Sequence, residues 1–129
     1  MENIKINFAH ICDMAFLSQG GKANIIGIFK VIFANSFPTV HPKFSIITSF
    51  SLKNLEGAHT QVIKIVHAED GKEIGRPISI EFIANKEMEE INFIGDVLNT
   101  SFDRPGKYFI RIYIDNGLIH SAPLDVIKR

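Results

Sequence analysis

This sequence has a single cysteine, no excess of either charge and no segment like a secretory signal. Each of these features argues against a class of protein. The 129 residues include one cysteine, Cys12, so no internal disulfide can form and a reducing, cytoplasmic compartment is expected. Fourteen basic and fourteen acidic side chains cancel to a net charge of +0, and Lys and Arg are scattered, which argues against nucleic-acid binding. The segment "MENIKINFAH" lacks a basic region followed by an apolar run, so no secretory signal is expected.

No apolar run in the sequence is long enough to cross a membrane as a helix. The most apolar stretch, Ile25–Phe33, is interrupted by Lys30 and is followed by Pro38, whereas a spanning helix needs about 20 apolar residues. Gly27 and the β-branched residues around it also favour a strand over a helix. We therefore expect a single interior strand here and no membrane partner.

The sequence instead has short runs in which apolar residues recur at every second position, as in Ile4, Ile6 and Phe8. Three dipeptides between such runs are typical of hairpin turns: Gly20-Gly21, Asp70-Gly71 and Asn116-Gly117. The expected strands are residues 4–14, 25–33, 44–52, 60–68, 78–82, 91–93, 108–114 and a last strand through Leu124 and Val126. Residues 35–42 and 96–105 are expected to be loops.

About eight strands at this spacing predict an all-β fold. The sequence shows no amphipathic helix, no repeat and no linker, so we expect residues 1–129 to form one domain. An antiparallel, immunoglobulin-like β-sandwich is the favoured architecture, because each sheet then buries one face against the other. A small closed β-barrel is the alternative.

The segment "FDRPGKYFI" resembles the tyrosine corner of immunoglobulin-like sandwiches. In that motif a Tyr hydroxyl bonds to nearby upstream backbone, and here the hydroxyl is that of Tyr108, after Gly106. An ordinary half-buried Tyr after a Pro-Gly turn is the other interpretation. Gly106, Tyr108, Asn116 and Gly117 are accordingly expected to have structural roles.

The segments "ICDMAFLSQGGKANIIGIFKVIFANSFPTVHPKF" and "RPGKYFIRIYIDNG" resemble a family of small bacterial proteins of unknown function. The resemblance covers most of the chain in order: an early Cys-Asp, a Gly-containing turn, the "GIF" strand, an FP-x-x-HP segment and an RPG-x-Tyr hairpin. Residues 51–100 match only in their strand pattern. The resemblance implies a cytoplasmic β-sandwich, no assigned activity and no catalytic residues to transfer.

His10 and Cys12 are two residues apart, so on a regular strand they share a face and are candidate ligands for zinc or copper. His120 is the candidate for a further ligand. Cys12 is also in register with Ile4, Ile6 and Phe8, which predicts a buried core thiol instead. The buried thiol is favoured, and no cofactor is expected.

The proline-bracketed segment "FPTVHP" has two interpretations. In the first, Phe37, Val40 and His41 form a stiff recognition tip. In the second, Phe37 and Val40 close the end of the sandwich while His41 is solvated. The second interpretation is favoured. The sequence has no recognised catalytic motif, and Glu87, Glu89 and Glu90 are expected to be a solvated charged loop, so an enzyme is not expected.

The apolar strand expected at residues 25–33 leads to a functional hypothesis. A two-sheet sandwich covers one face of a strand, which leaves Ile26, Ile28 and Ile32 to be covered by a loop, covered by a partner, or exposed. We therefore predict a non-enzymatic binding or assembly module, as a homodimer or with an unidentified protein partner. A β-sandwich that binds a small ligand or a metal is the alternative, and an enzyme ranks third.

Overall fold

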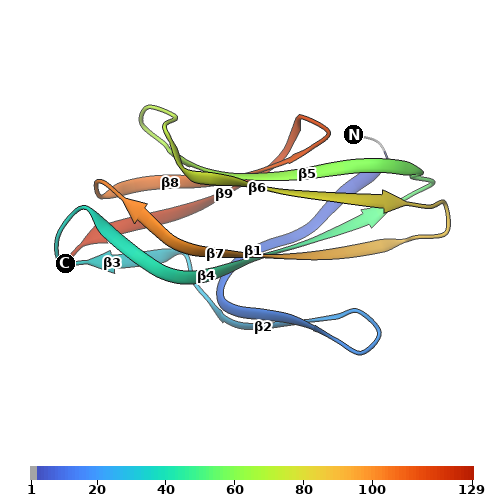
Figure 1. The fold of residues 1–129 in the computed structure, drawn as a ribbon, viewed down its shortest axis with the longest axis horizontal. Helices are drawn as coiled ribbons and strands as arrows, with labels where there is room; N and C mark the ends of the chain where they lie inside the picture. Colours follow the sequence, from blue (N-terminus) through green and yellow to red (C-terminus); the bar gives the residue numbers. More distant parts are fainter. Residues whose placement is uncertain (1–2) are drawn as a thin grey trace.

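Nine β-strands form two stacked sheets in the computed structural model, which describes residues 3–129 (Figure 1). The strands are β1 (Ile4–Ser18), β2 (Lys22–Ile28), β3 (Val31–Ala34), β4 (Thr39–Leu52), β5 (Gly57–His67), β6 (Glu73–Ala84), β7 (Glu90–Phe102), β8 (Gly106–Ile114) and β9 (Gly117–Lys128). The described residues contain no helix that is long and apolar enough to span a membrane.

The first sheet has the strand order β2-β1-β4-β7 and the second has the order β3-β9-β8-β5-β6. Neighbouring strands are antiparallel, except that β3 runs parallel to β9. The predicted all-β sandwich is confirmed. The closed barrel is wrong, because the strands form two separate sheets.

The hydrophobic core lies between the two sheets, and strict alternation builds it. On β8, Tyr108, Ile110, Ile112 and Ile114 all point inward and are at most 1% exposed. Side chains of β4 face them from the first sheet, as Phe44, Ile46 and Phe50 do. The period-two pattern that was visible in the sequence therefore identifies these core faces directly.

The apolar stretch at residues 25–33 is two strands in different sheets, so the single interior strand predicted there is wrong. β2 pairs with β1, and β3 pairs with β9. Phe29 and Lys30 carry the chain across: the Phe29 N–H donates to the Ile11 carbonyl at 2.9 Å, and the Asp125 N–H donates to the Lys30 carbonyl at 2.9 Å. This switch between sheets explains why nine strands are present instead of eight.

Parts of the two segments predicted as loops belong to strands, whereas residues 35–38 and 103–105 do lie between strands. β4 begins at Thr39, so His41 and Pro42 lie within it, and β7 continues through residues 96–102. The first part of β4 pairs with β7 alone, because its pairing with β1 starts only at Ser45. A proline is tolerated there, since that part of the strand has one free edge.

Two of the three predicted turns differ from the structure. The β8–β9 turn consists of Asp115 and Asn116, with φ values of 48° and 70°, so it lies one residue before the predicted Asn116-Gly117. Gly117 is the first residue of β9. The β5–β6 connection spans residues 68–72, and not the two residues Asp70-Gly71.

A register shift in β1, between Ile6 and Phe8, changes which side chains face the core. Beyond it Ile11 pairs with the core residue Ile46, and Cys12 pairs with Ser45 on the outer face of the first sheet. The prediction that Cys12 shares the core face of Ile4 and Ile6 is therefore wrong. Cys12 is nevertheless fully buried, on the other side of the sheet.

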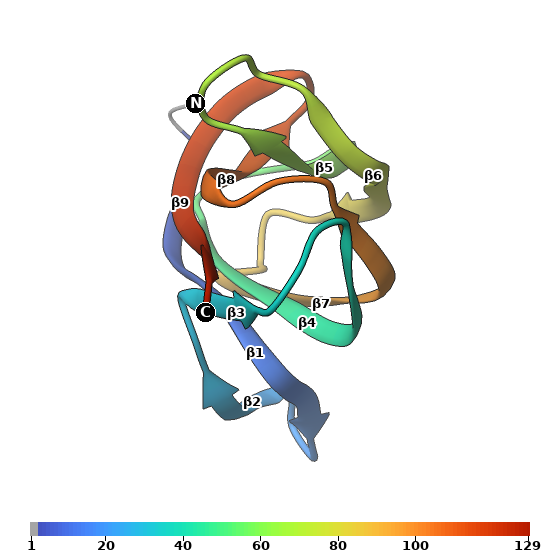
Figure 2. The same ribbon diagram turned by 90° about the vertical axis from the view of Figure 1, so that its left-hand side faces the viewer.

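The outer face of the first sheet is covered by a third layer. Residues 13–28, called the β1–β2 hairpin below, lie beneath this sheet on the side away from the second sheet (Figures 1 and 2). On that outer face Ser45, Ile47 and Ser49 are at most 1% exposed. Ser45 and Ser49 are thus buried because the hairpin covers this face, which strand alternation alone cannot reveal.

Candidate functional site

One face of the β1–β2 hairpin carries an exposed apolar surface. Met14 pairs with Ile26, and Ile28 lies two residues further along the same face of β2. Met14, Phe16, Ile26 and Ile28 are 48%, 46%, 53% and 51% exposed. We call these four side chains the hairpin face. Several large apolar side chains exposed together are typical of an interaction site, whereas single ones are not informative.

The hairpin owes its shape to its glycines and to one contact at its tip. Gly20 and Gly21 have φ values of 84° and 75°, and the Gly21 N–H donates to the Ser18 carbonyl at 3.0 Å. Asn92 on β7 donates from Nδ2 to the Gly21 carbonyl at 3.2 Å. A cavity of about 570 Å³ lies between the tip and β7. The tip therefore touches the body through a polar contact beside an open space.

Gly27, near the end of β2, is required by its surroundings. Its φ is 71°, and a Cβ atom there would clash with the Asp13 carboxylate. The register between β1 and β2 is regular from Lys22 to Ile26. Gly27 therefore marks where the regular part of the hairpin ends and the chain turns toward β3.

The three isoleucines predicted for the interaction surface do not lie together. Ile26 and Ile28 are exposed on the hairpin face, whereas Ile32 is 6% exposed and belongs to the core cluster. The prediction for Ile32 is wrong, because the crossing at Phe29 and Lys30 places it in the second sheet. Met14 and Phe16 were missed, because β1 alone does not show which of its residues leave the body.

The "FPTVHP" residues do not form a recognition tip. Phe37 is half-buried and packs against the core, whereas Val40 is 56% exposed. His41 is half-buried, with its ring centroid 5.9 Å from that of Phe29 and 5.6 Å from that of Phe44. The expectations that Val40 plugs the sandwich and that His41 is merely solvated are therefore both wrong.

The candidate metal ligands are brought only partly together. His10 and His120 line one cavity of about 210 Å³ between β1 and β9, but Cys12 does not line it. The Cys12 thiol donates to the Ser45 carbonyl at 3.6 Å, and burial raises its pKa, which disfavours the thiolate that binds metals. In the described part of the chain, no three His, Cys, Asp or Glu side chains are placed to hold a metal ion.

The glutamates considered for acid–base chemistry lie at the surface. Glu87 and Glu89 are exposed in the β6–β7 connection. Glu90 is the first residue of β7 and accepts a hydrogen bond from the Ser49 hydroxyl at 3.3 Å. Glu90 lines the cavity between the hairpin tip and β7, whereas Glu87 and Glu89 do not.

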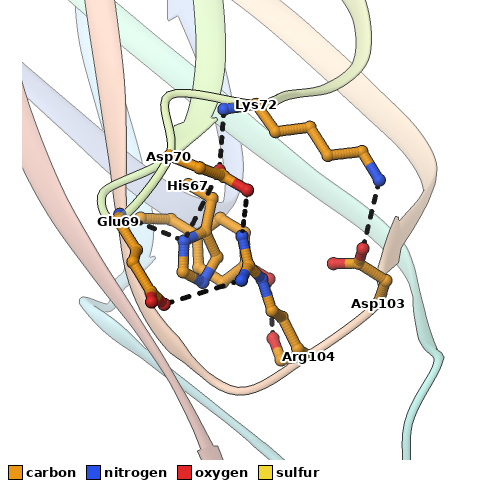
Figure 3. A network of polar contacts seen from close by, with 7 residues as sticks. His67, Glu69, Asp70, Lys72, Asp103 and Arg104 are labelled. Atoms are coloured by element: carbon orange, nitrogen blue, oxygen red, sulfur yellow. Dashed lines mark hydrogen bonds and ion pairs between the residues drawn. The ribbon is translucent and has the colours of Figure 1, made fainter.

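A polar cluster that sequence reasoning missed surrounds His67, at the end of β5 (Figure 3). His67 is 3% exposed, and its Nδ1 accepts a hydrogen bond from the Glu69 N–H at 3.1 Å. This bond assigns the ring proton to Nε2, which is buried with no partner among the described residues. A Cβ atom at Gly106 would lie 3.1 Å from that nitrogen.

The rest of this cluster ties the β5–β6 connection to the β7–β8 connection. The Tyr108 hydroxyl donates to the Arg104 carbonyl at 2.6 Å, which is the bond of a tyrosine corner. The Arg104 guanidinium donates to Asp70 at 2.5 Å, and Lys72 pairs with Asp103 at 3.2 Å. The Lys72 backbone N–H, with help from Arg104, lowers the pKa of Asp70. The cluster is thus a set of ties between connections, with no open reactive group.

The two packed sheets and the Tyr108 corner define the class of this protein: an immunoglobulin-like β-sandwich. Within that class, the chain belongs to DUF6941, a family of unknown function, and the match covers residues 7–127. No curated protein matches the chain.

Two of the similar solved structures share the fold at very low sequence identity. The alkylpurine DNA glycosylase AlkC of Pseudomonas fluorescens, bound to DNA with an abasic site analogue, has a TM-score of 0.59 at 8% identity, covering 96% of this chain and 30% of that protein. A β-glucosidase from Listeria innocua in complex with glucose has a TM-score of 0.54 at 7% identity, with 96% and 16% coverage. An immunoglobulin-like protein from Pseudomonas aeruginosa has a TM-score of 0.42 at 13% identity, with 96% of both chains covered. The chain spans less than a third of the first two proteins, and the likeness to them shows the fold alone.

Proposed function

We propose that this protein is a non-enzymatic, cytoplasmic binding module and that the hairpin face is its contact surface. The observation that carries the proposal is the exposure of Met14, Phe16, Ile26 and Ile28 side by side on the hairpin at the edge of the first sheet. Leaving such side chains in water forgoes hydrophobic stabilisation, at about 25 cal/mol per Å² of apolar surface. A partner that covers the hairpin face recovers this free energy.

The placement of the hairpin face supports a role in binding over a role in folding. The core cluster contains none of its four residues. Replacing them with polar residues removes few contacts within the chain, so we expect binding and stability to respond separately.

Native mass spectrometry of gently purified protein tests this proposal. We expect a species heavier than the 14.5 kDa chain, and we expect it to disappear in the Ile26→Ser, Ile28→Ser double variant. The matched control is Ile83→Ser, which changes an equally apolar side chain that is 76% exposed on β6. If wild-type protein is strictly monomeric at every concentration, or if the double variant keeps the heavier species, the proposal is overturned.

A small-ligand function is the second candidate, and one cavity favours it. A space of about 400 Å³ lies between the edges of β6 and β7, lined by Ile63, Ile65 and Ile74 among others, with Arg76 also lining it. Ligand sites have volumes of about 300–1,000 Å³ and combine apolar walls with few polar groups. The apolar walls and Arg76 favour an aliphatic carboxylate, whose charged end would contact Arg76 and lie away from Asp96, which also lines the space.

Its test is a thermal shift with decanoate, in wild type and in Arg76→Gln. We expect a rise in Tm with wild-type protein that is smaller in the variant. Equal shifts, or none at all, would remove this candidate.

A further inference from the structure

We infer that the partner of the hairpin face is a second copy of this chain, bound by antiparallel pairing of β2 with β2 of that copy. The two first sheets, each ordered β2-β1-β4-β7, then become one continuous sheet of eight strands. This inference rests on the proposed function, and it adds the identity of the partner and the way in which it binds.

β2 offers an open edge. It pairs with β1 on one side only, so its other side presents unpaired backbone N–H and C=O groups. The register from Lys22 to Ile26 is uninterrupted, and the irregular Gly27 comes after it. About five residues are therefore available for a regular ladder with another strand.

The other sheet edges carry features that discourage pairing. β6 is interrupted by a register shift that spans Gly75 to Pro77, and β3 has only four residues. β7 contains Asn99 with a φ of 51°, and it carries Glu90 and Asp96. Proteins protect exposed edges with such irregularities, prolines, charges and short strands. β2 differs from these edges in combining no proline, one charged residue and a regular register over five residues.

The charge pattern of β2 favours an antiparallel second copy. Its one charged residue, Lys22, is at one end of the strand. Antiparallel pairing about Asn24 places the two Lys22 residues at opposite ends, roughly 14 Å apart at 3.4 Å per residue. Parallel pairing would place the two ammonium groups side by side, which is unfavourable. The net charge of +0 adds no long-range repulsion between copies.

The same arrangement sets the two hairpin faces next to each other. A two-fold axis through the sheet keeps the hairpin face of both copies on the same side. With the axis at Asn24, Ile26 of one copy lies opposite Lys22 of the other, and Met14 lies beside Ile26 in the next row. Backbone pairing supplies the hydrogen bonds that join the copies, and the methylene stem of each Lys22 covers part of Ile26 in the other copy.

A cysteine scan tests the pairing itself. Ala23→Cys, Asn24→Cys and Ile25→Cys are oxidised under mild conditions, and covalent dimer is followed on non-reducing gels. A residue near the two-fold axis has its Cβ about 4.5–5.5 Å from its symmetry mate, close to disulfide distance. The native Cys12 is fully buried and so competes little. The control is Ile83→Cys at the exposed edge of β6.

We expect at least one β2 position to form covalent dimer about tenfold faster than the control or more, because pairing raises the effective concentration of the two thiols. Rates equal to the Ile83→Cys control at every β2 position would overturn the inference. Circular dichroism of each variant confirms that the chain is folded before oxidation.

A charge variant separates this inference from the proposed function. Asn24→Glu places two carboxylates together at the axis, whereas Asn24→Gln keeps the residue neutral. In sedimentation velocity and native mass spectrometry, we expect a dimer of twice the chain mass that Asn24→Gln retains and Asn24→Glu loses. A heavier species that contains a different protein and depends on Ile26 and Ile28 would leave the proposed function standing and overturn the second copy. Monomer at all concentrations would overturn both.

Discussion

Ile112 on β8 and Ile26 on β2 are the same residue type, both in regular strands, yet the first is 0% exposed and the second is 53% exposed. β8 lies between β5 and β9 in the second sheet, and its inward face packs against the first sheet. β2 is the edge strand of the first sheet, so it has a neighbour on one side only, and it lies below the two stacked sheets (Figure 2). The comparison teaches that burial follows from the layers that pack on a strand and not from the hydrophobicity of its residues.

The largest expected effect comes from truncating each of these two isoleucines. Ile112→Ala leaves a cavity between the sheets and should lower the free energy of unfolding by about 2–5 kcal/mol. Ile26→Ala removes an exposed side chain and should change it by less than about 0.5 kcal/mol. Urea unfolding of both variants, at a protein concentration where the chain is monomeric, measures the difference. Equal losses would show that the hairpin is part of the core.

The next effect concerns the tyrosine corner, a tie within the body. Tyr108→Phe removes the hydroxyl that donates to the Arg104 carbonyl, which should cost about 1–2 kcal/mol of stability. Tyr113→Phe is the control, because Tyr113 is half-buried and no described residue accepts a hydrogen bond from its hydroxyl. Thermal unfolding compares the two variants. A loss no larger than that of the control would show that the corner bond contributes nothing.

A pH-dependent tie joins β5 to the β8–β9 turn. His59 Nδ1 lies 2.5 Å from Asp115 Oδ2, and His59 Nε2 lies 2.8 Å from the Glu56 carbonyl, so both ring nitrogens face acceptors. The hydrogen bond with Asp115 raises the pKa of His59, and the hydrogen bond with His59 lowers the pKa of Asp115. The imidazolium form is thus favoured in the folded protein.

The sign of the pH effect follows from these two directions. The His59 contribution is complete below its ordinary pKa of 6.5 and is lost as pH rises through the raised value. The Asp115 contribution is present above its ordinary pKa of 3.8 and is lost as pH falls through the lowered value. The pair therefore stabilises the fold most between these two ordinary values.

We expect Asp115→Asn to lower the pKa of His59 toward its ordinary value and to be more destabilising at pH 5.5 than at pH 9. NMR titration of the His59 ring and urea unfolding at both pH values measure these effects. The hairpin face carries no ionisable side chain, so Ile26→Ser serves as a control whose effect should not change with pH. An unchanged His59 titration in Asp115→Asn would contradict the assignment.

The smallest expected effect tests the hydrogen bond between Asn92 and the hairpin tip. Asn92→Ala removes the donor to the Gly21 carbonyl, and we expect global stability to change by less than about 1 kcal/mol. Hydrogen exchange of the hairpin amides should become faster, while that of β8 amides stays the same. If both regions become faster together, the hairpin and the body unfold as one unit, and the contrast between them fails.

The core faces could be predicted from the sequence because strand alternation is local. Tyr108, Ile110 and Ile112 alternate with half-buried residues, and this pattern requires no knowledge of the partner sheet. The exposure of Ile26 and Ile28 could be anticipated for the same reason, since residues 25–33 have more apolar side chains than one sheet face can bury. Ile32 could not be assigned, because the crossing depends on hydrogen bonds between Lys30 and the distant Asp125.

The surroundings of His67 and the face on which Cys12 lies could not be predicted from the sequence, for two different reasons. His67 contacts Gly106 and Tyr108, about 40 positions away in sequence, so no local pattern indicated its cluster. Cys12 alternates with Ile4 and Ile6 in sequence, yet the register shift beyond Ile6 places it on the outer face. A one-residue shift reverses the face of every following side chain, and sequence periodicity does not record it.

The sequence by itself determined the all-β class, the alternating core faces and the hairpin at Gly20-Gly21, because each depends on residues adjacent in the chain. Only the tertiary structure decided which sheet each strand joins, that β2 and β3 separate, and that the β1–β2 hairpin forms a third layer with an open edge. Those outcomes depend on pairing between segments distant in sequence, such as β3 with β9. The hairpin face exists because that pairing leaves β2 with one neighbour.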